Sequence, residues 1–185
     1  MKKEYRLAIE KLFFAELKRI DPGFERVKVK AICKYDGEAV SVKSVGTVKL
    51  FISVIPNPKG HEEFAVEIGW SKRNEFPDLN MRPSIFSIED NTEFDTDDGM
   101  IRLTSFSRQN QFGWKFQGID YESDVKYFSG TDALRTTPKE IIEQDLKRKP
   151  TKDEATVAVR PAVKSAIDDL KKFGLPYLEK FLTTV

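Results

Sequence analysis

The pattern that organises the sequence is an alternation of large apolar side chains with polar or small ones over residues 63–70. A period of two places alternate side chains on the same face of a strand. The large residues that share this face are Phe64, Val66, Ile68 and Trp70. We therefore predict a strand here, and we expect it to carry the core of the domain.

The same period predicts further strands on both sides of this one. They are expected at residues 24–34, 38–44, 47–55, 100–106 and 111–118. The turn signals Asp36-Gly37 and Pro56-Asn57-Pro58-Lys59-Gly60 favour hairpins, as does the short polar link 107–110 between the last two strands. These features predict an antiparallel sheet of about five strands, with an aromatic stripe of Phe112, Trp114 and Phe116 on its core face.

Apolar residues with a period near 3.6 predict a helix over residues 3–20, which Asp21-Pro22-Gly23 should end. Glu16 lies inside the apolar stripe, and we expect it to lie at a frayed edge or to pair with a lysine rather than to be a half-buried acid with a raised pKa. Leu7 and Phe14 lie on the opposite side, and we expect them to make a second contact with the core rather than a dimer seam.

The C-terminal part of the sequence also predicts helices. One is expected over residues 137–147, and Thr151 and Glu154 have the spacing of a capping box. Pro161 favours a continuous helix that begins there and is capped by Gly174, with a last turn or two in residues 175–182. The predicted fold class is therefore α+β, with an N-terminal helix and C-terminal helices packed on one face of the sheet.

Length and composition fit one domain over residues 1–185, with 120–156 as a candidate insertion or extended segment. Lysine and arginine number 31 against 30 acids, so a net charge of +1 gives no overall field toward DNA or an anionic membrane. The single cysteine, Cys33, excludes an internal disulfide and cysteine-based zinc sites. With no predicted secretory signal or membrane span, the expected location is cytoplasmic.

Three short stretches resemble a bacterial family catalogued as domain of unknown function 4304 (DUF4304). They are the helix end followed by Gly23-Phe24, the strand end Val66–Trp70, and the C-terminal stretch Phe173-Gly174-Leu175-Pro176-Tyr177-Leu178-Glu179-Lys180-Phe181. The resemblance implies an α+β domain and carries no established activity, so it assigns no catalytic residue. It does not extend over residues 120–156.

Motifs for metal, phosphate or nucleophilic chemistry are weak in this sequence. The acidic run 89–99 does not place glycine and glutamate at the sixth and twelfth positions of a calcium loop. His61 has no partner at metal-ligand spacing, and a Cys33–His61 pair is the less favoured interpretation of two structural residues. We therefore predict no catalytic residue, no metal and no cofactor.

The strongest functional signal is basic residues interleaved with aromatic ones near the strand ends. If the strands pair, Lys49, Phe51, Glu67, Arg102, Lys115 and Gln117 share the outer face of the sheet, which we expect to be solvated. The candidate binding residues are Glu67, Trp70, Lys72, Arg73, Arg102, Arg108 and Lys115.

Three functions are compatible with these residues. The favoured one is a non-enzymatic module that binds another protein, such as an immunity or accessory protein, as a monomer or weak dimer and without a membrane. The alternatives are a binder of single-stranded nucleic acid that uses the sheet face, and a hydrolase with an acidic cleft around Glu16 or Glu67.

Overall fold

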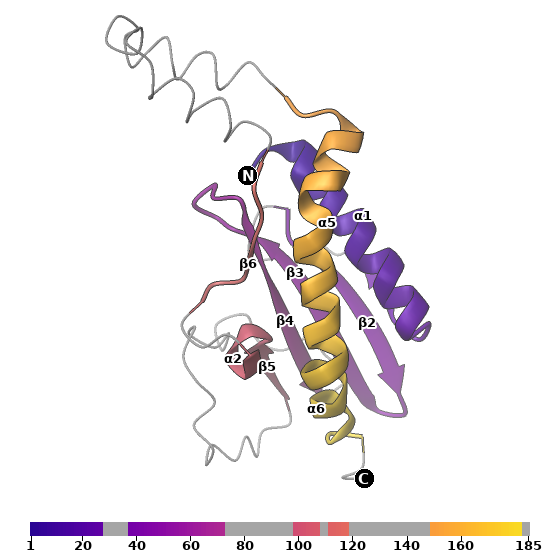
Figure 1. The fold of residues 1–185 in the computed structure, drawn as a ribbon. Helices are drawn as coiled ribbons and strands as arrows, with labels where there is room; N and C mark the ends of the chain where they lie inside the picture. The colour runs from indigo at the N-terminus through magenta and orange to yellow at the C-terminus, as the bar shows by residue number, and fades with distance from the viewer. Residues whose placement is uncertain (28–36, 73–97, 108–110, 119–148, 183–185) are drawn as a thin grey trace, which may run out of the picture.

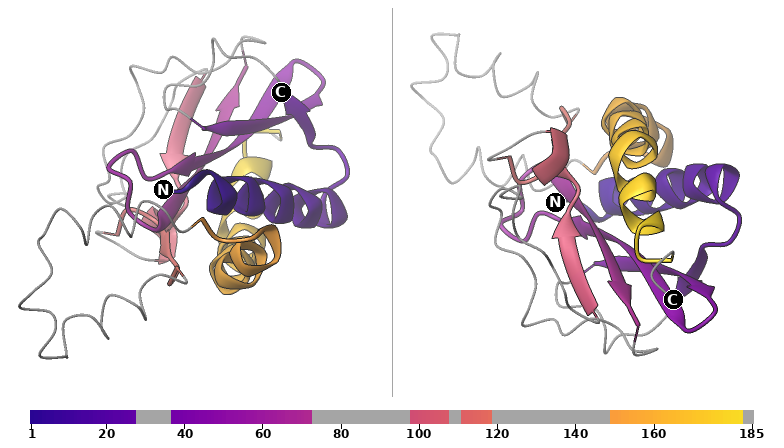
Figure 2. Two further views of the ribbon diagram at one scale, coloured as in Figure 1. Left: turned by 90° about the horizontal axis from the view of Figure 1, so that it is seen from above. Right: turned by 90° about the horizontal axis from the view of Figure 1, so that it is seen from below.

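The computed structural model describes residues 1–27, 37–72, 98–107, 111–118 and 149–182. In an α+β fold, helices α1 (Lys3–Ile20) and α5 (Lys152–Asp169) lie side by side over one face of an antiparallel sheet (Figure 1). The views from above and from below also place both helices on the same side of the sheet (Figure 2). The predicted fold class is confirmed.

The sheet follows chain order through strands β1 to β5, and every neighbouring pair is antiparallel. The strands are β1 (Glu25–Val27), β2 (Ala39–Val45), β3 (Val48–Pro56), β4 (Glu63–Ser71) and β5 (Asp98–Arg102). Strands β2, β3 and β4 confirm three of the predicted segments. The predicted first strand is described only as β1, because residues 28–36 lie outside the described residues, as do the acidic run 89–97 and the helix predicted over 137–147.

The predicted hairpin between residues 100–106 and 111–118 is wrong. Strand β5 ends at Arg102, the short helix α2 (Thr104–Ser107) follows, and β6 contains only Trp114–Lys115. Both strands pair with the same edge of β4 rather than with each other, with Ile101 opposite Ile68 and Trp114 opposite Phe64. A Cβ on Gly113 would lie 1.9 Å from the Phe64 carbonyl oxygen, so glycine permits this close approach.

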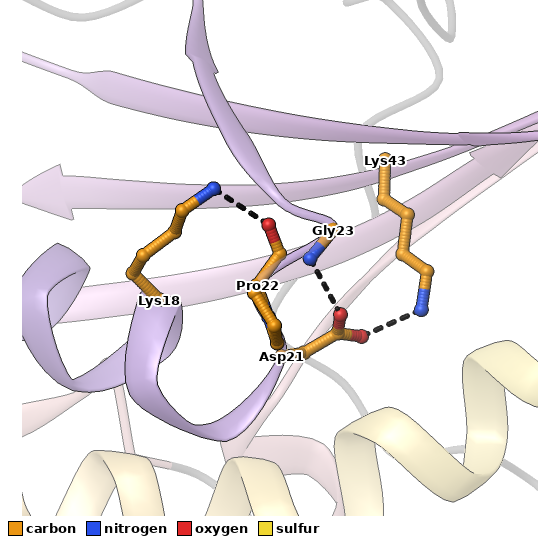
Figure 3. Close-up of polar contacts among 5 residues, drawn as sticks. All are labelled: Lys18, Asp21, Pro22, Gly23 and Lys43. Atoms are coloured by element: carbon orange, nitrogen blue, oxygen red, sulfur yellow. Dashed lines mark hydrogen bonds and ion pairs between the residues drawn. The ribbon is translucent and has the colours of Figure 1, made fainter.

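Helix α1 has the predicted bounds, and its end is fixed by side chains as well as by the turn residues (Figure 3). The Asp21 carboxylate accepts a hydrogen bond from the Gly23 backbone N–H at 2.9 Å and pairs with Lys43 of β2 at 2.7 Å. The Lys18 ammonium donates to the Pro22 carbonyl oxygen at 2.6 Å. These contacts connect the end of the helix to the sheet.

The C-terminal helix begins earlier than predicted, and helical winding continues through Gly174 without a cap there. The Thr151–Glu154 capping box is present, and α5 continues through Pro161, which is exposed on the outer side of the helix. Gly174 does not cap this helix. A π-helical turn, η4 (Leu170–Gly174), leads directly into α6 (Leu175–Glu179), and Gly174 keeps a right-handed helical conformation. The small size of Gly174 matters here, because an added Cβ would lie 2.7 Å from Leu170 and 3.1 Å from Leu103.

The core lies between the helices and the face of the sheet that carries Val54, Val66 and Ile68. Tyr5, Phe13 and other apolar residues of α1 join Val159, Val163 and Ile167 of α5 against this face. Ile68 is 0% exposed and Trp114 is 2% exposed, so both lie in the core as predicted. Each fully buried large apolar side chain contributes roughly 1.5–3 kcal/mol through burial.

Candidate functional site

The face of the sheet that points away from α1 and α5, here called the far face, carries a row of polar side chains. The strand registers place Val40 opposite Ser53, Ser53 opposite Glu67, and Glu67 opposite Arg102. Directly opposed residues of antiparallel strands project to the same face. The polar row therefore crosses β3, β4 and β5 and ends at Arg102, the last residue of β5, with Val40 of β2 beside Ser53.

Glu67 and Arg102 form a buried ion pair in this row. Arg102 Nη2 donates to Glu67 Oε1 at 2.7 Å, and the two side chains are 6% and 1% exposed, respectively. The ring of Phe112 lies over the guanidinium, with 4.7 Å between Arg102 Cζ and the ring centroid. We call these three residues the buried triad. Burial makes the pair costly to break, because a single remaining charge would have no counterion.

Other carboxylates near the row also have polar partners. The Ser53 hydroxyl donates to Glu38 Oε1 at 2.5 Å, and both residues are buried. The Asn57 side-chain amide donates to Glu63 Oε2 at 3.0 Å. Hydrogen bonds of this kind let acids remain in a strand whose two faces are both buried.

The prediction of a solvated outer face is wrong for most of its residues. Phe51, Glu67 and Arg102 are 2%, 0% and 5% exposed, although α1, α5 and α6 all lie on the opposite face. Lys49 is half-buried, whereas Lys115 and Gln117 are exposed. Charged residues in a strand suggest contact with water, but here the pairing between Glu67 and Arg102 offsets part of the cost of burying them.

The structure brings together only part of the predicted binding group. Glu67 and Arg102 are in contact, and Lys115 lies opposite Glu63, four residues along β4 from Glu67. Lys72 directly follows the last residue of β4 and is half-buried. Arg73 and Arg108 lie outside the described residues.

Trp70, the aromatic member of the predicted group, is 0% exposed on the core face. Its ring stacks on Phe181, with 3.8 Å between centroids and 10° between planes, and meets Tyr177 edge-on. A tryptophan covered in this way supports the C-terminal segment and has no free face for stacking on a nucleobase.

Sequence reasoning missed Phe112, which it placed in the core stripe with Trp114. Only Trp114 and Phe116 make contacts of that kind, with Phe64 and Tyr5 respectively. Alternation could not predict the position of Phe112, because residues 112 and 113 do not belong to a strand and β6 begins only at Trp114. Glu16, the other acid considered for catalysis, pairs at 2.8 Å with Arg19, so the paired interpretation is the one the structure supports.

A second surface lies on the outer side of α1. It includes Leu7, for which the predicted contact with the core is wrong, whereas Phe14 is buried in the core. The exposed residues Lys3, Leu7, Lys11, Ala15 and Lys18 recur every three or four positions. At 100° per residue they fall within about 120° of the helix circumference. We call this set the α1 stripe. It combines three cations with Leu7, which is 49% exposed.

No group of three or more His, Cys, Asp and Glu side chains suited to holding a metal ion occurs among the residues the structure describes. His61 is exposed in the turn after Gly60. Within the same residues, no helix has the length and apolar character needed to span a bilayer. Comparison with protein-family models, curated proteins and solved structures finds no match for this chain. The resemblance to domain of unknown function 4304 therefore stays a prediction.

Proposed function

We propose that the protein is a non-enzymatic binding module, of the immunity or accessory type, that recognises an acidic surface of another protein through the α1 stripe. The observation that supports this most is the charge of α1. Its exposed charged residues are Lys3, Lys11, Lys18 and Arg19, whereas all three of its acids are partly buried.

Two of those acids are also paired with arginines. Glu10 pairs with Arg26 of β1 at 2.8 Å, and Glu16 pairs with Arg19 at 2.8 Å. The lysines of the stripe therefore act on an approaching partner with little opposing charge on the same helix. Surface charge of one sign speeds association with the opposite sign and selects against like-charged partners.

The helical layer formed by α1 and α5 also exposes apolar side chains that could contact a partner. Leu7 is 49% exposed on α1, and Val157 is 69% exposed on α5, the helix that lies beside it. Protein interfaces commonly combine an apolar centre with a charged rim. An acidic partner with a small apolar contact fits this surface better than a uniformly anionic polymer would.

The test is affinity capture from an extract of the native host, comparing the wild type with a K3E/K11E/K18E variant. The matched control is K59E/K115E/K149E, which makes the same change in net charge at three exposed lysines outside α1. We expect the wild type and the control to retain one acidic protein at stoichiometric levels and the α1 variant to lose it. Nuclease treatment should not change the result.

The proposal would be abandoned if no protein were retained, or if both charge-reversed variants lost it equally. Retention of nucleic acid in place of protein, sensitive to K59E/K115E/K149E, would favour the alternative in which Lys115 contacts phosphates.

A further inference from the structure

Arg102 has more hydrogen-bonding capacity than its surroundings use. A guanidinium carries five N–H donors. Arg102 Nη2 donates to Glu67, but Nε and Nη1, which carry three of the five N–H bonds, have no hydrogen-bond partner in the described part of the chain. The side chain is only 6% exposed, so bulk water does not compensate for them. Buried donors without acceptors are costly, whereas the donors of Ser53 and Asn57 near the same row have carboxylate partners.

Phe112 does not satisfy these donors. Its ring lies over the guanidinium at 4.7 Å and contacts the face of the group. The N–H bonds of a guanidinium point outward in its own plane, toward the edge that an aromatic ring on its face leaves uncovered. The triad thus holds Arg102 in a fixed plane, with one edge bound to Glu67 and further donors directed along the remaining edges.

We propose that Arg102 anchors a binding site for a small carboxylate. A carboxylate presents two oxygen acceptors in one plane, which matches the planar, paired donors of a guanidinium. An arginine can bridge two carboxylates in this way, one from the protein and one from the ligand. Glu67 would then orient the guanidinium while Nε and Nη1 contact the ligand.

The charge of Glu67 sets a testable feature of this site. Arg102 and Glu67 together are neutral, so a bound carboxylate is repelled by Glu67 while it is attracted by Arg102. In the E67Q variant the glutamine side-chain oxygen can still accept from Nη2, but the repulsion is gone. The site therefore predicts that removing this one charge tightens binding of an anion, an effect that a purely structural arginine would not produce.

The experiment titrates the wild-type protein with sodium acetate at constant pH and ionic strength, with sodium chloride as the salt control. Acetamide serves as the neutral ligand of the same shape. The measurements are the melting temperature and the NMR signal of the Arg102 Nε–H group, which R102K identifies by its loss. We expect saturable shifts with acetate, and none with acetamide or chloride.

Variants then locate the effect. E67Q should bind acetate about tenfold more tightly, and R102K about tenfold more weakly, the size expected for a hydrogen bond to a charged group. R26K is the matched control, because Arg26 also pairs with a glutamate and lies over a phenylalanine but is 35% exposed. It should bind acetate as the wild type does.

Equal responses to acetate, acetamide and chloride in both the wild type and E67Q would overturn the proposal and assign the Arg102 donors to water. An acetate effect that R102K leaves unchanged would overturn it as well. Should R102K fail to fold, the comparison of the wild type with E67Q decides the question.

Discussion

Two clusters in this protein have the same composition and different surroundings. In one, Arg26 pairs with Glu10 at 2.8 Å and lies 4.1 Å above the ring of Phe14. In the buried triad, Arg102 pairs with Glu67 at 2.7 Å and lies 4.7 Å from the ring of Phe112. The geometries nearly coincide. The exposed fractions do not: 35% and 34% for the first ion pair, 6% and 1% for the second.

The difference teaches that solvent, rather than contact geometry, decides what such a cluster does. An exposed ion pair contributes about 0–1 kcal/mol, because water already stabilises both charges and salt screens their attraction. Breaking a buried pair costs about 3–5 kcal/mol, since one charge is left without a counterion. The Arg26 cluster connects β1 to α1, whereas the buried triad holds the Arg102 guanidinium in one orientation on the far face.

Ile68→Asp should show the largest effect, because it places an acid beside Glu67 but on the other face of β4. The two positions are both 0% exposed. Residue 68 lies opposite Ile52 on β3 and Ile101 on β5, and neither of these neighbours is a cation that could pair with the new acid. Loss of the isoleucine costs about 2–5 kcal/mol, and the unpaired charge costs several more. We expect an unfolded domain by circular dichroism; native spectra and an unchanged melting temperature would contradict this.

Glu67→Ala should destabilise the domain by about 3–5 kcal/mol, and Glu10→Ala by about 1 kcal/mol or less. Each variant removes the acid from one of the two clusters and leaves its arginine in place. Urea unfolding measures both changes in the free energy of unfolding. Similar values for the two would show that burial does not distinguish the clusters.

Replacing both members of the buried pair, in E67M/R102M, should be far milder than Glu67→Ala. Apolar residues in place of a buried ion pair are often neutral or stabilising by about 1–4 kcal/mol, since neither charge then has to be desolvated. The same urea titration tests this, with E10M/R26M as the exposed counterpart. A double variant less stable than Glu67→Ala alone would mean that the far face requires the charges themselves.

Tyr177 is half-buried, and its replacement should have the smallest effect on stability of the changes considered. Burial raises its pKa above the usual 10.0. The folded protein therefore holds the phenol proton more tightly than the unfolded chain does, and this contribution to stability is present below pH 10.0 and is lost as the pH rises through the folded value. Tyr177→Phe should weaken the alkaline loss of stability in urea titrations above that pH. An identical pH dependence in the two proteins would contradict it.

The sequence predicted those elements in which local pattern and tertiary packing agree. Helix α1 has the expected bounds because its apolar stripe and its Asp21-Pro22-Gly23 stop coincide. Strands β3 and β4 were predicted because alternate large apolar side chains, such as Ile52 and Val54 of β3 and Val66 and Ile68 of β4, face one layer of helices. Pro161 misled the prediction of α5, because a proline on the exposed side of a helix that the Thr151 capping box has already started does not have to end it.

The candidate site was harder to predict, because its meaning depends on contacts distant in the sequence. The pairing of Glu67 with Arg102 follows from strand register, and the expectation that they share a face is confirmed. Alternation could not reveal that this face is buried, nor that Phe112 leaves the aromatic stripe to cover Arg102. On α1, the pattern placed Leu7 opposite the apolar stripe but not at the surface, and the lysines gave no signal because exposed lysines at helical spacing are common on any surface helix.

The π-helical turn at Leu170–Gly174 has a consequence for how the end of the chain is specified. A π-turn holds one residue more than the α-helical turn it replaces. Winding the same residues as an ordinary α-helix would rotate everything downstream by about 100°. Phe181 would then turn away from Trp70, although neither ring had been altered. Deleting one residue within the π-turn would instead leave an α-helical turn and keep the downstream segment in place, so the contact between Phe181 and Trp70 depends on the local winding as well as on the two side chains.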